Sequence, residues 1–384
     1  MLNSRTIIVL IGILVVAAMA GLLLTGKGGE NTAQTSTTQP TSTPATSGGG
    51  ASEKVNLLGS GSTFVKPAMD VWIKDFTAKN PDIAIEYTGG GSGKGVKDIL
   101  SNLVDFAGSD PPLPRSKWEK YKGQILQFPV VLGAVAVVYN VPEIGNVQLN
   151  LTGEVIAKIY LGEIVYWDDP AIKELNPGVA DKLPHKEIIA IHRSDSSGTT
   201  QIFTTFLAKT CREWEEKVGI SKTVQWPVDE TGRGIGQEGN QGVTQAVKTT
   251  PYSIGYVELA YALRYGLPYA RLQNPAGKFV APSSETVSAA FAVENPPSPL
   301  DDWSDIAKEF VYSPASPDAY PLAGQTFIIV WKKWDDPAKC NAMKAFIEYI
   351  GSQGQENLPE GYAPLPEQLK KVVSQAAQLL ECSG

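Results

Sequence analysis

The sequence predicts an α/β fold with a parallel sheet, preceded by an N-terminal segment that is not part of the fold. The order strand, glycine-rich loop, helix recurs three times, and this alternation is typical of parallel sheets covered by helices. The chain has 384 residues, which suggests about two domains at the usual 100–200 residues each. Hydrophobic residues make up 42% of it and charged residues 19%, so a sizeable core can form.

Charge and composition exclude several classes of function. The chain contains 33 Lys and Arg residues against 40 Asp and Glu, a formal charge of −7. We therefore expect no nucleic-acid partner, because neutralising a phosphate backbone requires a basic face. Only two His and three Cys are present, without close pairing, so a zinc site has almost nothing to be built from. We expect no metal and no cofactor.

The N-terminal run Ile7–Leu24 is apolar and uncharged. Its 18 residues would extend about 27 Å as a helix, against a bilayer hydrocarbon thickness of roughly 30 Å. Ala18-Met19-Ala20 resembles the cleavage site of a secretory signal, but the apolar run continues past it. We predict that residues 1–26 are a transmembrane anchor, with a cleaved signal peptide as the alternative. Both place the rest of the chain outside the cytoplasm.

Residues 27–52 have the composition of a flexible linker. Ten of the twenty residues from 31 to 50 are Ser or Thr, and such a tract cannot bury enough surface to offset its ordering entropy. The charged residues of the first 52 positions are Arg5, Lys27 and Glu30, which sum to +1 and leave −8 for the remaining chain.

The first strand–loop–helix unit begins at Val55. Residues 55–58 predict a short buried strand, and Gly59–Thr63 is a loop rich in glycine and serine. Apolar residues then recur at positions 65, 69, 72 and 76, which form one face of a helix. The other two units have strands at 83–87 and 188–191, loops at 89–93 and 194–199, and apolar helix faces at 96–103 and 202–207.

The three loops have the composition of an anion site. The start of a helix leaves about four N–H donors unpaired and carries a partial positive charge. Glycine lets a ligand approach the backbone, and Ser and Thr add neutral donors. For any one such loop, an ordinary capped turn is the better interpretation. Three of them at the carboxyl ends of parallel strands predict a common site at one edge of the sheet.

Two enzyme-like interpretations of these loops fail. Gly93-Lys94 looks like the end of a P-loop, but Thr88 stands where that motif needs glycine, and no Ser or Thr follows the lysine. Ser197 is not in a nucleophile elbow, and the nearby His192 lies on the strand side of it. We interpret His192 and His185 as structural or surface residues and predict that the protein is not an enzyme.

Four charged residues stand in unusual loop contexts, and one of them is Lys94 in the second loop. Asp110 ends a short strand and precedes Pro111-Pro112, while Arg193 and Asp195 flank a serine just before the third helix. As alternatives, Asp110 can be a turn former, and Arg193 and Asp195 a surface ion pair.

Several motifs, taken together and in order, are similar to one family. They are GSGSTF at 59–64, YTGGGSGKGV at 87–96, DFAGSDPPL at 105–113, QFPV at 127–130, IYLGEI at 159–164, RSDSSGTT at 193–200, GNQGV at 239–243 and IGYVE at 254–258. The chain resembles the substrate-binding protein of the phosphate-specific ABC transporter, from about Val55 to the region of Cys340. The Pro-rich segment 295–317 matches weakly, and the anchor and linker depart from the usual soluble form.

The resemblance implies a two-lobed periplasmic-binding-protein-like fold of type II, in which each lobe is a central sheet flanked by helices. Lobe I would comprise residues 53–131 plus 296–384, and lobe II residues 132–295. Such a protein captures inorganic phosphate between its lobes and delivers it to the permease subunits of an ABC transporter. We expect a monomer held at the outer face of the membrane by its N-terminal segment. Sulfate, molybdate or a phosphonate is the alternative ligand, and a secreted phosphatase the alternative function.

Carried over residue by residue, the resemblance assigns a phosphate site. Its members are Thr63, Phe64, Ser92 and Asp110 from lobe I and Arg193, Asp195, Ser197, Gly198 and Thr199 from lobe II. Hydroxyls, backbone N–H groups and the Arg193 guanidinium would donate to the anion, and Asp195 would hold Arg193. Asp110 would accept the proton of the phosphate. Fully ionised sulfate would instead leave buried acceptors facing each other, at roughly 1–3 kcal/mol each.

The cysteines give a weaker signal. Three are present, at 211, 340 and 382, an odd number. We expect free thiols, with a Cys340–Cys382 pair outside the cell as the alternative. Near them, Gly324–Trp331 predicts a buried strand that returns to lobe I, and apolar residues at 343, 346, 347 and 350 predict a helix.

Overall fold

The computed structural model describes residues 54–291, 293–313 and 316–383. The predicted anchor, 1–26, and the predicted linker, 27–52, lie outside these residues. Within the described ranges, no helix is both long enough and apolar enough to span a bilayer.

A nine-stranded sheet runs through the molecule in the order β2–β1–β3–β11–β4–β8–β6–β7, with β13 also paired to β4. The strands are β1 (Val55–Gly61), β2 (Ile83–Gly89), β3 (Phe106–Ser109), β4 (Ile125–Asn140), β6 (Ile189–Arg193), β7 (Gly234–Gln237), β8 (Ser253–Glu258), β11 (Ala323–Trp331) and β13 (Tyr362–Ala363). The pairs β1–β2, β1–β3, β6–β7 and β6–β8 are parallel, as the strand–loop–helix pattern predicts.

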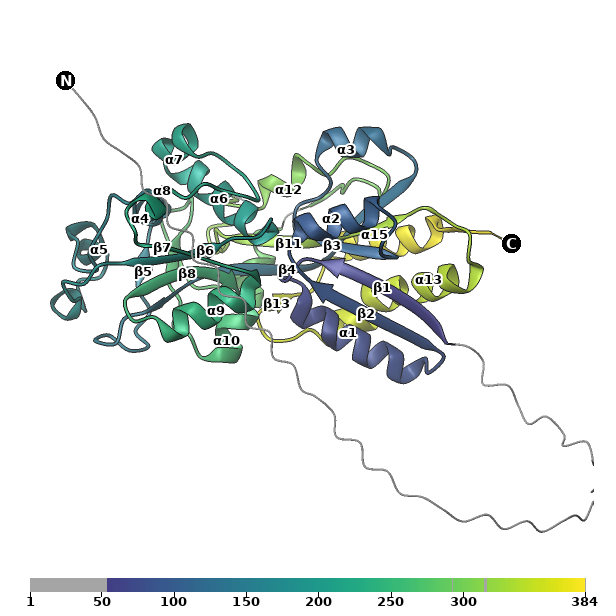
Figure 1. Cartoon of the computed structure of the whole chain (residues 1–384), viewed down its shortest axis with the longest axis horizontal. Coiled ribbons are helices and arrows are strands. Elements are labelled where there is room, and N and C mark those ends of the chain that lie inside the picture. Colours follow the sequence, from purple (N-terminus) through teal and green to yellow (C-terminus); the bar gives the residue numbers. More distant parts are fainter. Residues whose placement is uncertain (1–53, 292, 314–315, 384) are drawn as a thin grey trace, which may run out of the picture. The chain divides into compact units, whose positions relative to one another are not determined.

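The long strand β4 joins two parts of this sheet. Its residues 125–134 pair with β11, and its residues 135–140 pair with β8. We call β2, β1, β3, β11 and the first part of β4 the first half-sheet, and the second part of β4 with β8, β6 and β7 the second half-sheet. In Figure 1 the first lies on the right, beside the C-terminal helices, and the second on the left. The lobe boundaries themselves stay a prediction.

Helices cover the sheet and begin directly after its parallel strands. α1 (Lys66–Lys79) follows β1, α2 (Ser92–Leu100) follows β2, α6 (Gly198–Thr210) follows β6, and α9 (Gly239–Thr249) follows β7. The remaining helices are α3 (Arg115–Lys120), α4 (Gly153–Tyr160), α5 (Pro170–Leu175), the 3-10 turn Ala180–Lys182, α7 (Arg212–Lys217), α8 (Pro227–Glu230), α10 (Leu259–Tyr265), α11 (Ser284–Ser288), α12 (Ile306–Glu309), α13 (Pro337–Gly351), α14 (Gln353–Glu356) and α15 (Glu367–Leu379). Short strands β5 (Asn150–Leu151), β9 (Arg271–Gln273) and β10 (Phe279–Val280) form a second sheet, and β12 (Lys333–Trp334) pairs with β14 (Glu381–Cys382).

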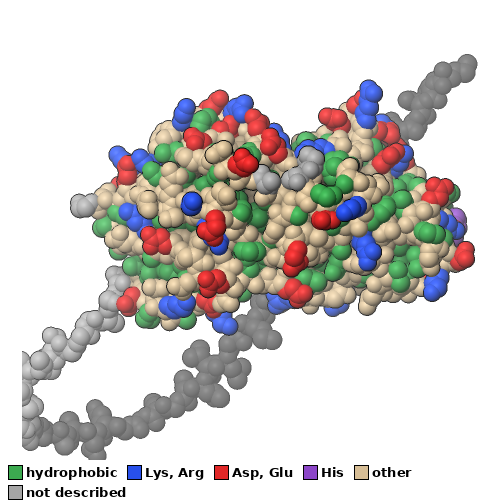
Figure 2. Space-filling view, turned by 180° about the vertical axis from the view of Figure 1, so that it is seen from behind, with side chains coloured by type: hydrophobic (Ala, Val, Ile, Leu, Met, Phe, Trp, Pro, Cys, Tyr) green, Lys and Arg blue, Asp and Glu red, His purple; other side chains and the backbone are tan. Residues whose placement is uncertain are grey.

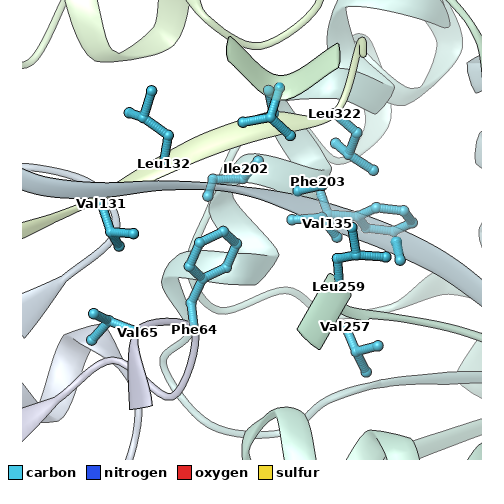
Figure 3. Packing of buried hydrophobic residues seen from close by; sticks show 14 of the residues in the cluster. Phe64, Val65, Val131, Leu132, Val135, Ile202, Phe203, Val257, Leu259 and Leu322 are labelled. Atoms are coloured by element: carbon cyan, nitrogen blue, oxygen red, sulfur yellow. The ribbon is translucent and has the colours of Figure 1, made fainter. Parts of the chain in front are cut away.

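The core extends across both halves of the sheet because β4 is buried almost throughout. All of its residues except Asn140 are buried, and the apolar face predicted for α1 packs into the same core. Figure 3 shows Phe64 among the β4 residues Val131, Leu132 and Val135, next to Leu259. Burial of these side chains stabilises the junction at about 1.5–3 kcal/mol for each large apolar residue. On the surface in Figure 2, acidic and basic side chains are interspersed.

The structure corrects the expectation for the cysteines. Cys340 and Cys382 form a disulfide, whereas Cys211 is free and buried as expected. The pairing of β12 with β14 carries Cys382 to the first turn of α13, where Cys340 lies. This contact joins residues 42 positions apart, so composition and spacing alone gave no reason to prefer it.

Candidate functional site

The loops that follow the parallel strands meet between the two half-sheets. Three of them are the predicted loops after β1, β2 and β6. The fourth lies between β7 and α9, where Gly239 has a positive φ of 67°. This fourth strand–glycine–helix unit was missed, although the same pattern of a short strand, a glycine and a helix start is present in the sequence at 234–249.

Asp110 is the central acidic group of the first half-sheet. Its side chain is buried, and its Oδ1 accepts hydrogen bonds from the Ser62 hydroxyl and from Thr326 Oγ1, the latter at 2.8 Å. Oδ2 accepts only a longer bond from Ser92 Oγ, at 3.3 Å. Burial raises the pKa of Asp110 to about 6, although the three hydroxyls and the charge of Arg193 oppose the shift. Oδ1 is therefore well satisfied, and Oδ2 keeps capacity for another donor.

Gly198 brings the start of α6 directly against this carboxylate. A side-chain carbon at Gly198 would lie 2.4 Å from Asp110 Oδ2 and 2.3 Å from Ser92 Oγ, so only glycine fits. Ser197 is the N-cap of α6, and its hydroxyl accepts a hydrogen bond from Thr200 N at 3.1 Å. The positive end of a helix from the second half-sheet thus faces the Asp110 carboxylate of the first.

Arg193 is the cation of the site and is held by Asp195. The guanidinium is buried and donates to both carboxylate oxygens of Asp195, from Nε at 2.6 Å and from Nη2 at 2.5 Å. Its Nη1 donates to Thr199 Oγ1 at 3.4 Å. Asp195 also accepts from the backbone N–H of Gly239 at 3.1 Å. These two hydrogen bonds to Asp195 fix the plane of the guanidinium.

Asn240 links the two halves of the site and was not predicted. Its backbone N–H and its Nδ2 donate to Thr63 Oγ1 at 3.1 and 3.0 Å, and Nδ2 also donates to Thr199 Oγ1 at 3.2 Å. Thr63 is fixed further because its carbonyl accepts from the Tyr261 hydroxyl at 2.7 Å. The side-chain amide of Asn240 therefore bonds both to Thr63 of the first half-sheet and to Thr199 of the second.

Phe64 positions the first loop through its side chain. Its ring packs so closely on β4 that a side-chain carbon at Gly133 would lie 2.8 Å from it, and Tyr362 meets it edge-on with centroids 6.4 Å apart. Its N–H donates to Ser62 Oγ at 3.0 Å, and that hydroxyl in turn donates to Asp110. The loop and the carboxylate are thus parts of one hydrogen-bonded unit.

Other sequence candidates lie in structural roles. Lys94 forms an ion pair with Asp98 within α2. His192 bonds to Asp229 at 2.7 Å and stacks on Trp226, with ring centroids 4.8 Å apart. In the described part of the chain, no group of three or more His, Cys, Asp or Glu residues could hold a metal.

The site therefore combines one guanidinium, one carboxylate, hydroxyls and helix N-termini from both half-sheets. The predicted residues Thr63, Ser92, Asp110, Arg193, Asp195, Ser197, Gly198 and Thr199 converge there, and Phe64 supports the loop. Such a set can hold an oxyanion that still carries a proton, because donors surround the anion while one acceptor remains for that proton.

Comparison with known proteins gives a consistent family. A model described as a PBP superfamily domain matches residues 31–353. The phosphate-binding protein PstS of Methanocaldococcus jannaschii is 43% identical over 353 residues, covering 87% of this chain and 90% of that protein. PstS of Xylella fastidiosa is 38% identical over 325 residues, or 84% of each chain. In fold, the chain is similar to a high-affinity periplasmic phosphate-binding protein solved with phosphate bound, at 22% identity, a TM-score of 0.63 and coverage of 83% of this chain and 92% of that one. The chain belongs to the PBP superfamily and, within it, to the family of the phosphate-binding proteins PstS.

Proposed function

We propose that this protein binds inorganic phosphate outside the cytoplasm, between its two half-sheets, and delivers it to the permease of an ABC transporter. The observation that carries the proposal is the buried Asp110 carboxylate, whose Oδ2 faces the glycine start of α6. The PstS relatives, which are named for phosphate binding, support the same ligand.

The anion would be held by one charged donor and several neutral donors. Arg193 supplies the one full positive charge, and Asp195 keeps it aimed. The N–H groups at the start of α6, including those of Gly198 and Thr199, would donate to the anion without adding a full charge. The hydroxyls of Thr63 and Ser197 add neutral donors, and the Ser92 hydroxyl would join them by turning from Asp110 Oδ2 to the anion.

Asp110 selects the anion through its acceptor. Hydrogen phosphate carries a proton that Oδ2 can accept, so both partners are satisfied. Sulfate is fully ionised at neutral pH and would place an oxygen against that carboxylate with no hydrogen between them. The selectivity therefore comes from a repulsion against the wrong ligand as well as attraction to the right one.

Binding is coupled to closure of the two halves. Across their junction, Gly93 N donates to the carbonyl of Ser196 at 2.9 Å, and Asn240 bonds Thr63. An anion that is contacted from both sides binds the closed form more tightly than the open one and so shifts the equilibrium toward it. We propose that the moving units are lobe I, residues 53–131 plus 296–384, and lobe II, residues 132–295.

We propose binding rather than catalysis. The hydroxyl of Ser197 accepts the N–H of Thr200 as a helix cap, and the imidazole of His192 is engaged by Asp229. Neither arrangement activates a nucleophile. We further propose that the protein acts as a monomer, tethered at the outer face of the membrane by residues 1–26, or released from it where that segment is cleaved.

Titration calorimetry of the full chain tests the ligand. We expect a single phosphate site, unaffected by sulfate in large excess. Absence of phosphate binding, or equal competition by sulfate, would overturn the proposal.

A further inference from the structure

A groove lies beside the proposed phosphate site, where the two half-sheets meet. Its volume is about 450 Å³, and its lining comes from both sides of the junction. Gly93 and Lys117 belong to the side of the first half-sheet, and Ser196 and Lys222 to the side of the second. We call it the lysine groove. No acidic side chain is among its lining residues.

The two lysines of the groove have no ion-pair partner among the described residues. Within the described ranges, the structure gives neither the Lys117 nor the Lys222 ammonium an ion pair or a side-chain hydrogen bond, whereas the nearby Arg115 pairs with Asp302 at 2.7 Å. Burial and the charge of Lys117 lower the pKa of Lys222 to about 8, and the charge of Asp110 opposes that shift. Two positive charges thus face each other across the junction, an arrangement that costs free energy unless an anion lies near them.

Lys222 is also adjacent to the phosphate site. Its carbonyl accepts the N–H of Ser197, the cap of α6, at 3.0 Å. At the same rim, Gly93 N donates to the Ser196 carbonyl and closes the junction. The groove is therefore separated from the buried site by the contacts that form on closure.

We infer that Lys117 and Lys222 form an outer capture site, which draws hydrogen phosphate to the mouth of the cleft before the halves close. The inference rests on the proposed function and names the entry side for the same ligand.

The negative net charge of the protein gives such a site a role. Residues 53–384 carry a formal charge of −8, so a doubly charged anion is repelled by the protein as a whole. Cations at the edge of a cleft focus the local field and raise the association rate of an anion.

The test measures association and dissociation rates of radiolabelled phosphate on the full chain. In the double variant Lys117→Gln/Lys222→Gln, we expect association to slow by about tenfold at low ionic strength, with dissociation changed by less than about twofold. Added salt should slow the wild type more than the double variant. The control is Lys74→Gln, which removes one positive charge from an exposed position of α1 and should change neither rate; it is compared with the single variant Lys117→Gln as well as with the double variant.

The outcomes distinguish a failure of the capture site from a failure of the proposed function. Normal phosphate binding by the wild type with unchanged association in the double variant, or a change confined to dissociation, would overturn the capture site alone. A wild type that binds no phosphate at equilibrium would overturn the proposed function and the capture site with it. If the double variant does not fold, the single variant Lys117→Gln, at an exposed position, gives the same readout with a smaller effect.

Discussion

Replacing Asp110 by Asn should change which anion the protein prefers. The two carboxylate oxygens are not equivalent, because Oδ1 accepts from the hydroxyls of Ser62 and Thr326 and Oδ2 faces Gly198. Those hydroxyls would keep the amide oxygen of the Asp110→Asn variant at the Oδ1 position. Its NH₂ group would then occupy the Oδ2 position and present a donor to the ligand.

The size of the effect follows from the hydrogen bonds exchanged. Phosphate loses a bond to a charged acceptor, which is worth about 1.5–3 kcal/mol. Sulfate no longer meets an unpaired buried acceptor, which relieves about 1–3 kcal/mol. The preference for phosphate over sulfate should therefore fall by at least about 2.5 kcal/mol, or roughly sixtyfold.

Competition calorimetry with both anions at neutral pH measures this ratio. Asp98→Asn is the matched control, because Asp98 is also buried but bonds to Ser60 and Lys94 away from the site, so its replacement should leave the ratio unchanged. A phosphate-to-sulfate ratio that stays at the wild-type value in Asp110→Asn would refute the role of Oδ2.

Four further outcomes are expected. In the wild type, sulfate should begin to bind as pH falls through about 6, because the raised pKa of Asp110 means that its carboxylate gains a proton there and becomes a donor. Titrations with sulfate alone between pH 7.5 and 5 should show its affinity rising in the wild type and staying constant in Asp110→Asn. Arg193→Ala should weaken phosphate binding by about tenfold or more without creating affinity for sulfate, as measured by calorimetry. Gly198→Ala should abolish tight binding while leaving the circular dichroism spectrum unchanged, because the added methyl group meets Ser92 and Asp110 only when the halves close. Cys382→Ser should lower the free energy of unfolding by up to about 4 kcal/mol, read from denaturant titration, since the disulfide closes a loop between residues 42 apart; a Cys211→Ser control should not reproduce that loss.

Local patterns in the sequence were sufficient to predict the repeated part of the fold. The helix face at 65, 69, 72 and 76 is the face that α1 buries, and the strand predicted at Gly324–Trp331 is β11 within one residue. Periodicity and glycine-rich loops report on short stretches of chain, so they predict which strands and helices exist.

Contacts between distant segments had no comparable signal. Asn240, Ser62 and Thr326 complete the site, but each is a common polar residue whose importance depends on a partner far along the chain. The Cys340–Cys382 disulfide was missed for the same reason, because its geometry is created by the pairing of β12 with β14. The setting of Asp110 after a strand and before two prolines singled it out within a few residues, but it was equally compatible with a turn former, and its assignment to the site came from the family resemblance.

The shared strand β4 would limit the opening of the two halves that we propose. Its hydrogen-bonding partner changes from β11 to β8 between Ala134 and Val135, with no intervening loop, and β13 braces the same region at Gly133. Opening would therefore have to bend this continuous strand, because no flexible loop joins the two halves at this point. A bent strand tends to return to its original curvature. We therefore expect a small opening movement and the same closed position after each cycle.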